Sequence, residues 1–140
     1  MISFLETDPA LVPMMGKYGC AVLSALRILR REYNQAEANM IYASLVAGKF
    51  IAFDCTVLDW KNMLLALSPN LLFKDVTDAT YVCAVNEREI LKWHLGNINE
   101  DHFTVGNGAS KTDWDPMNRP DIMALPTTRF IHKVVVTYSL

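Results

Sequence analysis

The feature that most constrains this fold is the order of its hydrophobic patterns. Apolar residues recur at helical spacing in the first half of the chain, and alternation typical of strands dominates the last third. Helices and strands segregated along a chain favour an α+β fold, with the helices packed on an antiparallel sheet. The chain is 140 residues long and shows no repeat or linker, so a single domain over 1–140 is expected.

The helical spacing predicts helices in three segments: 19–33, 35–47 and about 57–67. Gly48 is a plausible end for the second helix, and either Asp54 or Thr56 can cap the third. Residues 1–17 are expected to be irregular, because two prolines limit helix formation there.

Strands or extended connectors are expected in the segments with β-rich or alternating composition: 50–55, 79–85, 87–95, 102–107, 111–115 and 128–138. The segment 87–95 has two interpretations. Asn86 with Glu89 resembles a helix capping box, but the alternating apolar residues that follow favour a strand, which we prefer. Turn residues at 106–110 join 102–107 and 111–115 into a hairpin, which Pro116 ends.

Charge and composition narrow the classes of function. The net charge is −2 and the pI about 5.9, which argues against a nucleic-acid binder and a basic membrane anchor. No apolar run is long enough to span a bilayer, and the N-terminus lacks the pattern of a signal peptide. An odd, sparse set of three cysteines suggests reduced thiols and a cytoplasmic protein. Neither a metal site nor a cofactor is expected, because the cysteines and histidines lack ligand spacing.

Three residues form a candidate catalytic group. Cys20 opens the first strong helix, where the helix dipole and free N–H groups favour a thiolate. His102 begins a strand, and Asp115 follows it by 13 positions (115 − 102), across the predicted hairpin. Asp115 can therefore reach one ring nitrogen of His102 and leave the other for Cys20. This is the nucleophile, base and orienting acid of a cysteine hydrolase.

Several short motifs carry a resemblance to known families. YGCAVLSAL resembles the nucleophile helix of papain-like cysteine peptidases. HFTVGNG and TDWDP are similar to the histidine strand and Asp-Pro turn of the bacteriocin-processing, or double-glycine, peptidases. With FLETD, EILKW and a closing RF strand, the chain is most similar to an uncharacterised phage and spirochaete-plasmid family. The resemblance implies a papain-like fold, a Cys20–His102–Asp115 triad and a peptide or protein substrate.

The chain departs from papain-like peptidases at the oxyanion hole. These enzymes usually carry a Gln before the cysteine, but residues 12–19 contain neither Gln nor Asn. The hole is then expected to use the Cys20 backbone N–H and a second donor, with the Tyr18 hydroxyl as a candidate. Gly19 is expected to turn the backbone sharply and leave space for a substrate, and Trp114 to cover the His–Asp pair.

Two functions from different classes follow. One is a thiol hydrolase of the peptidase or amidase type, whose substrate is a peptide, an isopeptide or a cell-wall cross-link. The other is a non-catalytic binding or inhibitor protein on the same scaffold, directed at a host protein if the chain is phage-encoded. The missing Gln favours the second function, and the agreement of the three candidate residues favours the first. The oligomeric state is left open.

Overall fold

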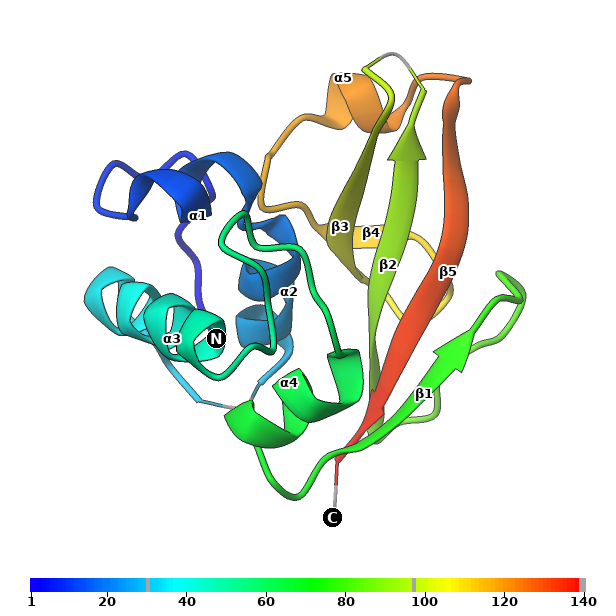
Figure 1. Cartoon of the computed structure of the whole chain (residues 1–140). Coiled ribbons are helices and arrows are strands. Elements are labelled where there is room, and N and C mark those ends of the chain that lie inside the picture. Colours follow the sequence, from blue (N-terminus) through cyan, green and yellow to red (C-terminus); the bar gives the residue numbers. More distant parts are fainter. Residues whose placement is uncertain (30, 97, 139–140) are drawn as a thin grey trace.

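The computed structural model describes residues 1–29, 31–96 and 98–138, and it has an α+β fold, as expected. One antiparallel sheet lies beside a group of helices (Figure 1). The helices are α1 (Pro13–Tyr18), α2 (Cys20–Ile28), α3 (Gln35–Ala47), α4 (Trp60–Leu67) and α5 (Pro120–Met123). The strands are β1 (Leu72–Val76), β2 (Glu87–Leu95), β3 (Glu100–Gly106), β4 (Thr112–Trp114) and β5 (Thr128–Thr137). Their order in the sheet is β1-β5-β2-β3-β4.

The central element of the helical group is α2. It lies between α3 and the sheet and contacts both β2 and β3 (Figure 1). Seven of its nine residues are buried, which explains why nearly every position of this segment is apolar or small. The helix is shorter than the predicted 19–33, because the backbone becomes extended at Leu29. The predicted segment also includes Arg30, which lies outside the described residues.

The N-terminal segment contains a helix that the sequence analysis did not expect. Pro13 opens α1 at its first position, where a missing N–H leaves no hydrogen bond unmade. The prediction that 1–17 is irregular is therefore wrong for its last turn and a half. The second predicted helix is confirmed: α3 covers 35–47, and Asn34 and Glu37 form a reciprocal capping box at its start.

The third predicted helix begins later than expected. Its cap is Asp59, whose carboxylate accepts a hydrogen bond from the Asn62 N–H at 3.0 Å, so α4 starts at Trp60. Neither Asp54 nor Thr56 serves as the cap. The Asp54 carboxylate instead accepts from the Thr56 N–H at 3.1 Å, within the preceding loop.

The strands at 87–95, 102–107, 111–115 and 128–138 are confirmed within one or two residues. The strand interpretation of 87–95 is correct, because β2 pairs with β3 on one side and β5 on the other. The segment 79–85 forms no strand, and that expectation is wrong. Its polar backbone groups have other partners: the Cys83 N–H donates to Gly108 O at 2.8 Å, and Tyr81 O accepts from Lys133 at 2.5 Å.

Two further differences concern the middle of the chain. The segment 50–55 is mostly a connector, with a single bridge between Ile51 and Val57. The strand β1 was not expected, and it occupies the edge of the sheet beside β5. The apolar core lies between α2 and the sheet, where side chains such as Leu26, Ile90 and Val134 are fully buried. None of the helices formed by the described residues is long and apolar enough to cross a membrane.

Candidate active site

Cys20 is the first residue of α2, as predicted. The N–H groups in the first turn of a helix have no acceptor within that helix, so they can bind another group. The Cys20 side chain is half-buried and lines a cavity of about 300 Å³. Gly19 does not serve the role expected of it, because its φ of −77° is ordinary. A Cβ at that position would lie 2.3 Å from Met15 O, so glycine is needed for the close approach of α1 and α2.

His102 and Asp115 meet across the hairpin. The His102 Nε2 donates to the Asp115 Oδ1 at 2.7 Å, and the two side chains are only 5% and 11% exposed. The Asp115 carboxylate also accepts from the backbone N–H groups of Met117 and Arg119. Burial would raise the pKa of Asp115, but the hydrogen bond and charge of His102 and these N–H groups hold it below its usual range.

The second ring nitrogen of His102 is not used by Asp115. His102 lines the same cavity as Cys20, and the Asp115 contact leaves Nδ1 free for another partner. In residues 1–29, 31–96 and 98–138 no hydrogen bond joins the Cys20 Sγ to the His102 ring. Such contacts in a ligand-free site commonly tighten only when substrate binds. The structure therefore brings the three predicted residues to one place, with the acid behind the histidine.

The pKa of Cys20 moves in the direction opposite to the one expected. Burial is the largest cause, and with the nearby charge of Glu6 it raises this pKa to about 12. The backbone N–H groups of Phe103 and Ala21 oppose this shift without cancelling it. A helix terminus contributes only about 0.3–1 kcal/mol, which is less than the cost of burying a thiolate. The resting form of Cys20 is a neutral thiol.

Glu6 is a site residue that the sequence analysis missed. It is 8% exposed and lines the same cavity, and its Oε1 has no hydrogen-bond partner in the described part of the chain. The Glu6 N–H donates to Pro116 O at 2.8 Å, which fixes this segment beside the turn that carries Asp115. Burial, followed by the charge of Asp115, raises the pKa of Glu6 to about 8. No local pattern in the sequence marked it as a site residue, because Glu6 stands close to Asp8 in a segment without repeat or catalytic motif.

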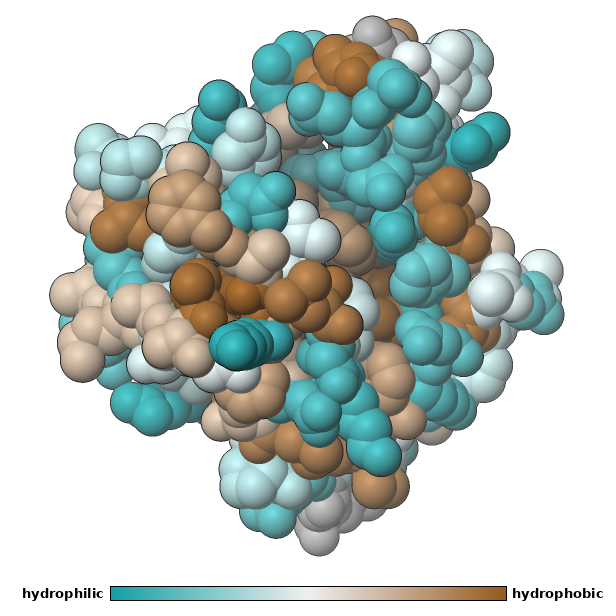
Figure 2. All heavy atoms as spheres, in the orientation of Figure 1, coloured by the Kyte–Doolittle hydropathy of each residue, from teal (hydrophilic) through white to brown (hydrophobic). Residues whose placement is uncertain are grey.

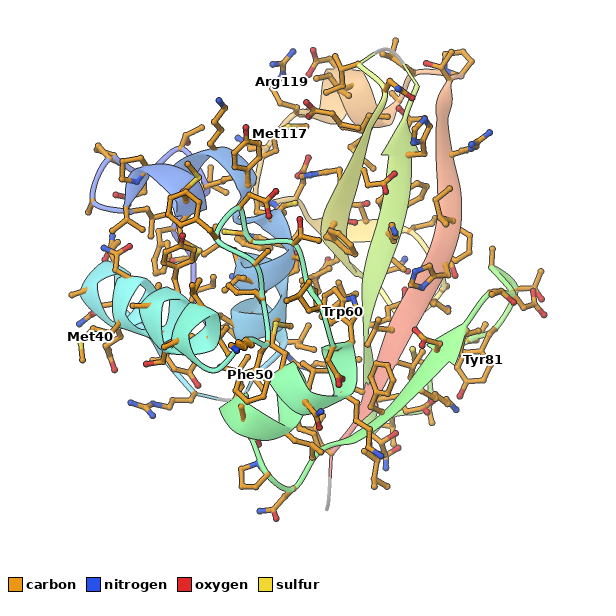
Figure 3. All side chains as sticks on the ribbon, in the orientation of Figure 1. Met40, Phe50, Trp60, Tyr81, Met117 and Arg119 are labelled. Atoms are coloured by element: carbon orange, nitrogen blue, oxygen red, sulfur yellow. The ribbon has the colours of Figure 1, made fainter. Side chains whose placement is uncertain are left out.

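Three aromatic side chains, Tyr18, Trp60 and Phe103, line the cavity from different elements. The Trp60 ring lies 5.4 Å from the Phe103 ring, at the start of α4. Tyr18 is 40% exposed at the end of α1. In Figure 3, Trp60 and Met117 approach the gap between the helices and the sheet from opposite ends, and both residues line the cavity. Trp60 therefore belongs to the site as well as to the core.

Trp114 takes no part in this cavity. It packs against the core, and the Arg27 guanidinium lies 5.2 Å from its ring centre. The expectation that Trp114 covers the His–Asp pair stays a prediction, and the contacts that the structure shows for its ring are with the core and with Arg27 of α2.

The surface beside the cavity is apolar on one side. Figure 2 shows hydrophobic side chains gathered near the middle of this face, and hydrophilic ones over the sheet. The loop between α3 and α4 supplies cavity residues 54–57, and Phe53 and Leu58 beside them are more than half exposed. An extended ligand that entered the cavity would also contact this loop.

No group of three or more His, Cys, Asp or Glu side chains in the described residues is arranged to hold a metal ion. A comparison with known proteins finds no family model, no curated protein and no solved structure that matches this chain. What the site can do is therefore inferred from its own residues and geometry.

Proposed function

We propose that this protein is a thiol hydrolase of the papain-like type, a peptidase or amidase. One observation carries the proposal: a cysteine at a helix N-terminus and a histidine held by a buried carboxylate line the same cavity. Asp115 uses one ring nitrogen of His102 and leaves the other for the proton of Cys20. The papain-like resemblance of the sequence motifs agrees with this arrangement and is part of the proposal.

The resting state of Cys20 determines the mechanism. Because its pKa is about 12, the thiol must lose its proton as it attacks, and His102 Nδ1 is the base that accepts it. The sulfur bonds to the carbonyl carbon, and the carbonyl electron pair moves to oxygen. The tetrahedral intermediate collapses to a thioester while His102 returns the proton to the leaving amine. Water, deprotonated by His102, then releases the acid and the thiol.

The role of Asp115 is to position and stabilise His102. The Asp115 Oδ1 accepts a hydrogen bond from the His102 Nε2–H. This bond fixes the tautomer in which the lone pair of His102 is on Nδ1. Its negative charge also stabilises the imidazolium that forms during attack. The backbone N–H groups that hold Asp115 keep this charge in place.

The cavity and the apolar loop beside it suit an extended peptide or protein chain. A peptide, an isopeptide and a cell-wall cross-link all present an amide carbonyl to Cys20. The cytoplasmic location and the phage origin suggested by the sequence belong to the same proposal. If both hold, the substrate is a protein or peptide of the host.

A non-catalytic binding or inhibitor protein is the second candidate. The observation that favours it is the thiol itself, because burial raises the pKa of Cys20 instead of lowering it. In that case the cavity and the exposed side chains of Phe53 and Leu58 would serve contact with a partner protein.

The two functions are separated by the reactivity of the cysteines toward iodoacetamide at pH 7. Cys55 and Cys83 serve as internal controls, because burial also raises their pKa values to about 12. If His102 acts as a base, Cys20 is alkylated at least tenfold faster than either control. The variant His102→Ala removes this advantage, and Cys20→Ala also abolishes the acylation burst with p-nitrophenyl acetate. Equal labelling of the three cysteines would rule out the hydrolase and favour the binding protein.

A further inference from the structure

Acyl transfer through Cys20 requires hydrogen-bond donors for the oxygen that becomes negative in the tetrahedral intermediate. The backbone N–H of Cys20, at the start of α2, is one such donor. The sequence offers no Gln or Asn in 12–19 for a second donor. Tyr18 is 40% exposed, so water competes with a substrate oxygen for the hydrogen bond of its hydroxyl. A second, buried donor has to come from elsewhere in the chain.

We propose that the protonated carboxyl group of Glu6 is this second oxyanion donor. The inference rests on the proposed hydrolase function and identifies a further catalytic residue of the same site. Glu6 lines the cavity that Cys20 and His102 line, and it is more than nine-tenths buried. Its Oε1 is buried and has no partner in residues 1–29, 31–96 and 98–138, so a hydrogen bond with a bound group would satisfy it.

The position of Glu6 is fixed by the fold. Its N–H donates to Pro116 O at 2.8 Å, next to the acid that orients His102. The carbonyl of Glu6 lies 3.5 Å from the Cβ position of Gly16, so this segment also packs against α1. Glu6 is therefore held between α1, which leads into Cys20, and the turn that follows β4. A donor held on rigid elements stabilises an oxyanion without reorganising during the reaction.

The charges around Glu6 favour its neutral form. Asp115 raises its pKa by repulsion, after the larger effect of burial, and the value is about 8. The titratable thiols of Cys20 and Cys55 interact with the same carboxylate. The other charged side chains on the cavity come from α1, the loop after α3, β2 and β3: Lys17, Asp54, Lys92, Glu100 and Asp101. No ion pair joins either lysine to Glu6 in the described part of the chain, so no cation holds the carboxyl ionised below pH 8.

Glu6 neither gains nor loses a proton in this step. As the Cys20 sulfur bonds to the carbonyl carbon, the electron pair moves to oxygen, and the Glu6 O–H donates a hydrogen bond to that oxygen. The proton stays on Glu6 while the intermediate collapses and the leaving group departs. An ionised Glu6 loses the donor and also repels the attacking sulfur. Acylation should therefore fall as the pH rises through about 8.

The test compares Glu6→Gln with Glu6→Leu, because both side chains are close to Glu in size. Gln keeps a donor at every pH, and Leu has none. The probe is the acylation burst with p-nitrophenyl acetate from pH 5.5 to 9.5, in which the thiol displaces p-nitrophenolate through a tetrahedral oxyanion. Iodoacetamide is the control probe, because its alkylation displaces iodide without forming an oxyanion. Melting temperatures and circular dichroism establish that each variant is folded.

We expect Glu6→Leu to slow acylation by about 10²-fold, the usual cost of one oxyanion donor, and to leave alkylation of Cys20 undiminished. Glu6→Gln should recover most of the acylation rate and should lack the decline above pH 8. Acylation by Glu6→Leu within twofold of the wild type would overturn the proposal. So would an equal loss of acylation and alkylation, because Glu6 would then act on the nucleophile and not on the oxyanion.

A second readout applies if Glu6→Leu does not fold. The wild type and Glu6→Gln are then compared alone, and identical alkaline limbs would overturn the proposal. Failure of the underlying hydrolase function has a different signature: Cys20→Ala would retain the burst. That result does not depend on any variant of Glu6.

Discussion

Two buried pairs in this protein, each of a basic and an acidic side chain, have the same separation and different surroundings. Lys133 Nζ and Glu89 Oε1 lie 2.7 Å apart in the centre of the sheet, and both side chains are fully buried. His102 Nε2 and Asp115 Oδ1 also lie 2.7 Å apart, at the cavity. Distance alone does not distinguish a structural pair from one that can carry out chemistry.

The difference lies in how many polar atoms already have partners. Lys133 Nζ donates to Tyr81 O, Glu89 and the Ser110 hydroxyl, which uses all three of its protons. The Glu89 Oε2 accepts from the N–H groups of Gly108 and Ser110. The polar atoms of this pair are all hydrogen-bonded within the protein and are not available to a ligand. Their hydrogen bonds hold the tip of the β3–β4 hairpin and the 79–85 segment against the sheet.

The pair at the cavity is incomplete in comparison. Asp115 is well supplied with donors, but His102 keeps a ring nitrogen and Glu6 keeps a carboxyl oxygen beside the same cavity. Unused polar atoms are expensive in a folded protein unless a ligand or a reaction uses them. The contrast assigns Lys133–Glu89 to the stability of the fold, and it leaves His102–Asp115 as the pair for which we propose chemistry.

The largest effect should follow from breaking the saturated pair. Lys133→Met leaves Glu89 as an uncompensated buried charge, which typically costs about 3–5 kcal/mol. We expect the free energy of unfolding in urea to fall by that amount. The double variant Lys133→Met, Glu89→Leu should recover most of the loss, because no lone charge remains. A folded Lys133→Met of normal stability that fails to be acylated would contradict the division between the two pairs.

A smaller effect should appear in the pH dependence of stability. The pKa of Glu6 is raised to about 8 from the 4.5 of an exposed Glu, so the folded protein binds this proton more tightly. The stability that the protonated Glu6 contributes is fully present below pH 4.5 and is lost as the pH rises toward 8. Each pKa unit corresponds to about 1.4 kcal/mol, so Glu6 should reduce stability by roughly 2–3 kcal/mol between pH 5 and pH 7.

This loss is measured by urea unfolding of the wild type and Glu6→Gln across that range. Groups other than Glu6 titrate equally in both proteins, so the difference between the two curves isolates Glu6. Parallel curves would show that Glu6 is ionised in the folded protein at pH 5. That result would also contradict a protonated Glu6 at neutral pH, and it would leave His102 as the group at the cavity to which we assign chemistry.

The smallest effect should come from neutralising the orienting acid. Asp115→Asn keeps an acceptor oxygen for His102 Nε2–H but loses the negative charge. We expect acylation to slow by about tenfold, which corresponds to about 1.4 kcal/mol. Asp115→Ala removes the acceptor as well and should slow acylation further. Burst rates of both variants at pH 7 check the order, and an Asn variant slower than the Ala variant would contradict it.

The sequence predicted the site best where contacts are local. The His102–Asp115 contact follows from 13 positions of spacing and a Gly- and Asn-rich turn, because a hairpin fixes which residues face each other. Cys20 was placed correctly because the helical spacing begins there. The direction of the Cys20 pKa shift was not predicted, because burial and the charge of Glu6 depend on contacts that are distant in sequence.

The missed features depend on tertiary partners. Glu6 reaches the cavity through one backbone hydrogen bond to Pro116, 110 positions later (116 − 6), and no local pattern encodes that contact. The segment 79–85 has strand composition, but β1 takes the edge of β5. Its backbone groups bond to Lys133 and Gly108 instead. Competition between segments for one sheet edge is settled by packing, which a single sequence does not display.

The local origin of the histidine–acid hairpin has a consequence for how the chain folds. A short hairpin can close in about 1–10 µs, so β3 and β4 can bring His102 and Asp115 together early in folding. Cys20 and Glu6 join them only through contacts that span most of the chain, and such contacts form late. A nascent or partly folded chain then carries an assembled base without a nucleophile beside it. The proposed hydrolytic site is therefore assembled only when folding is complete.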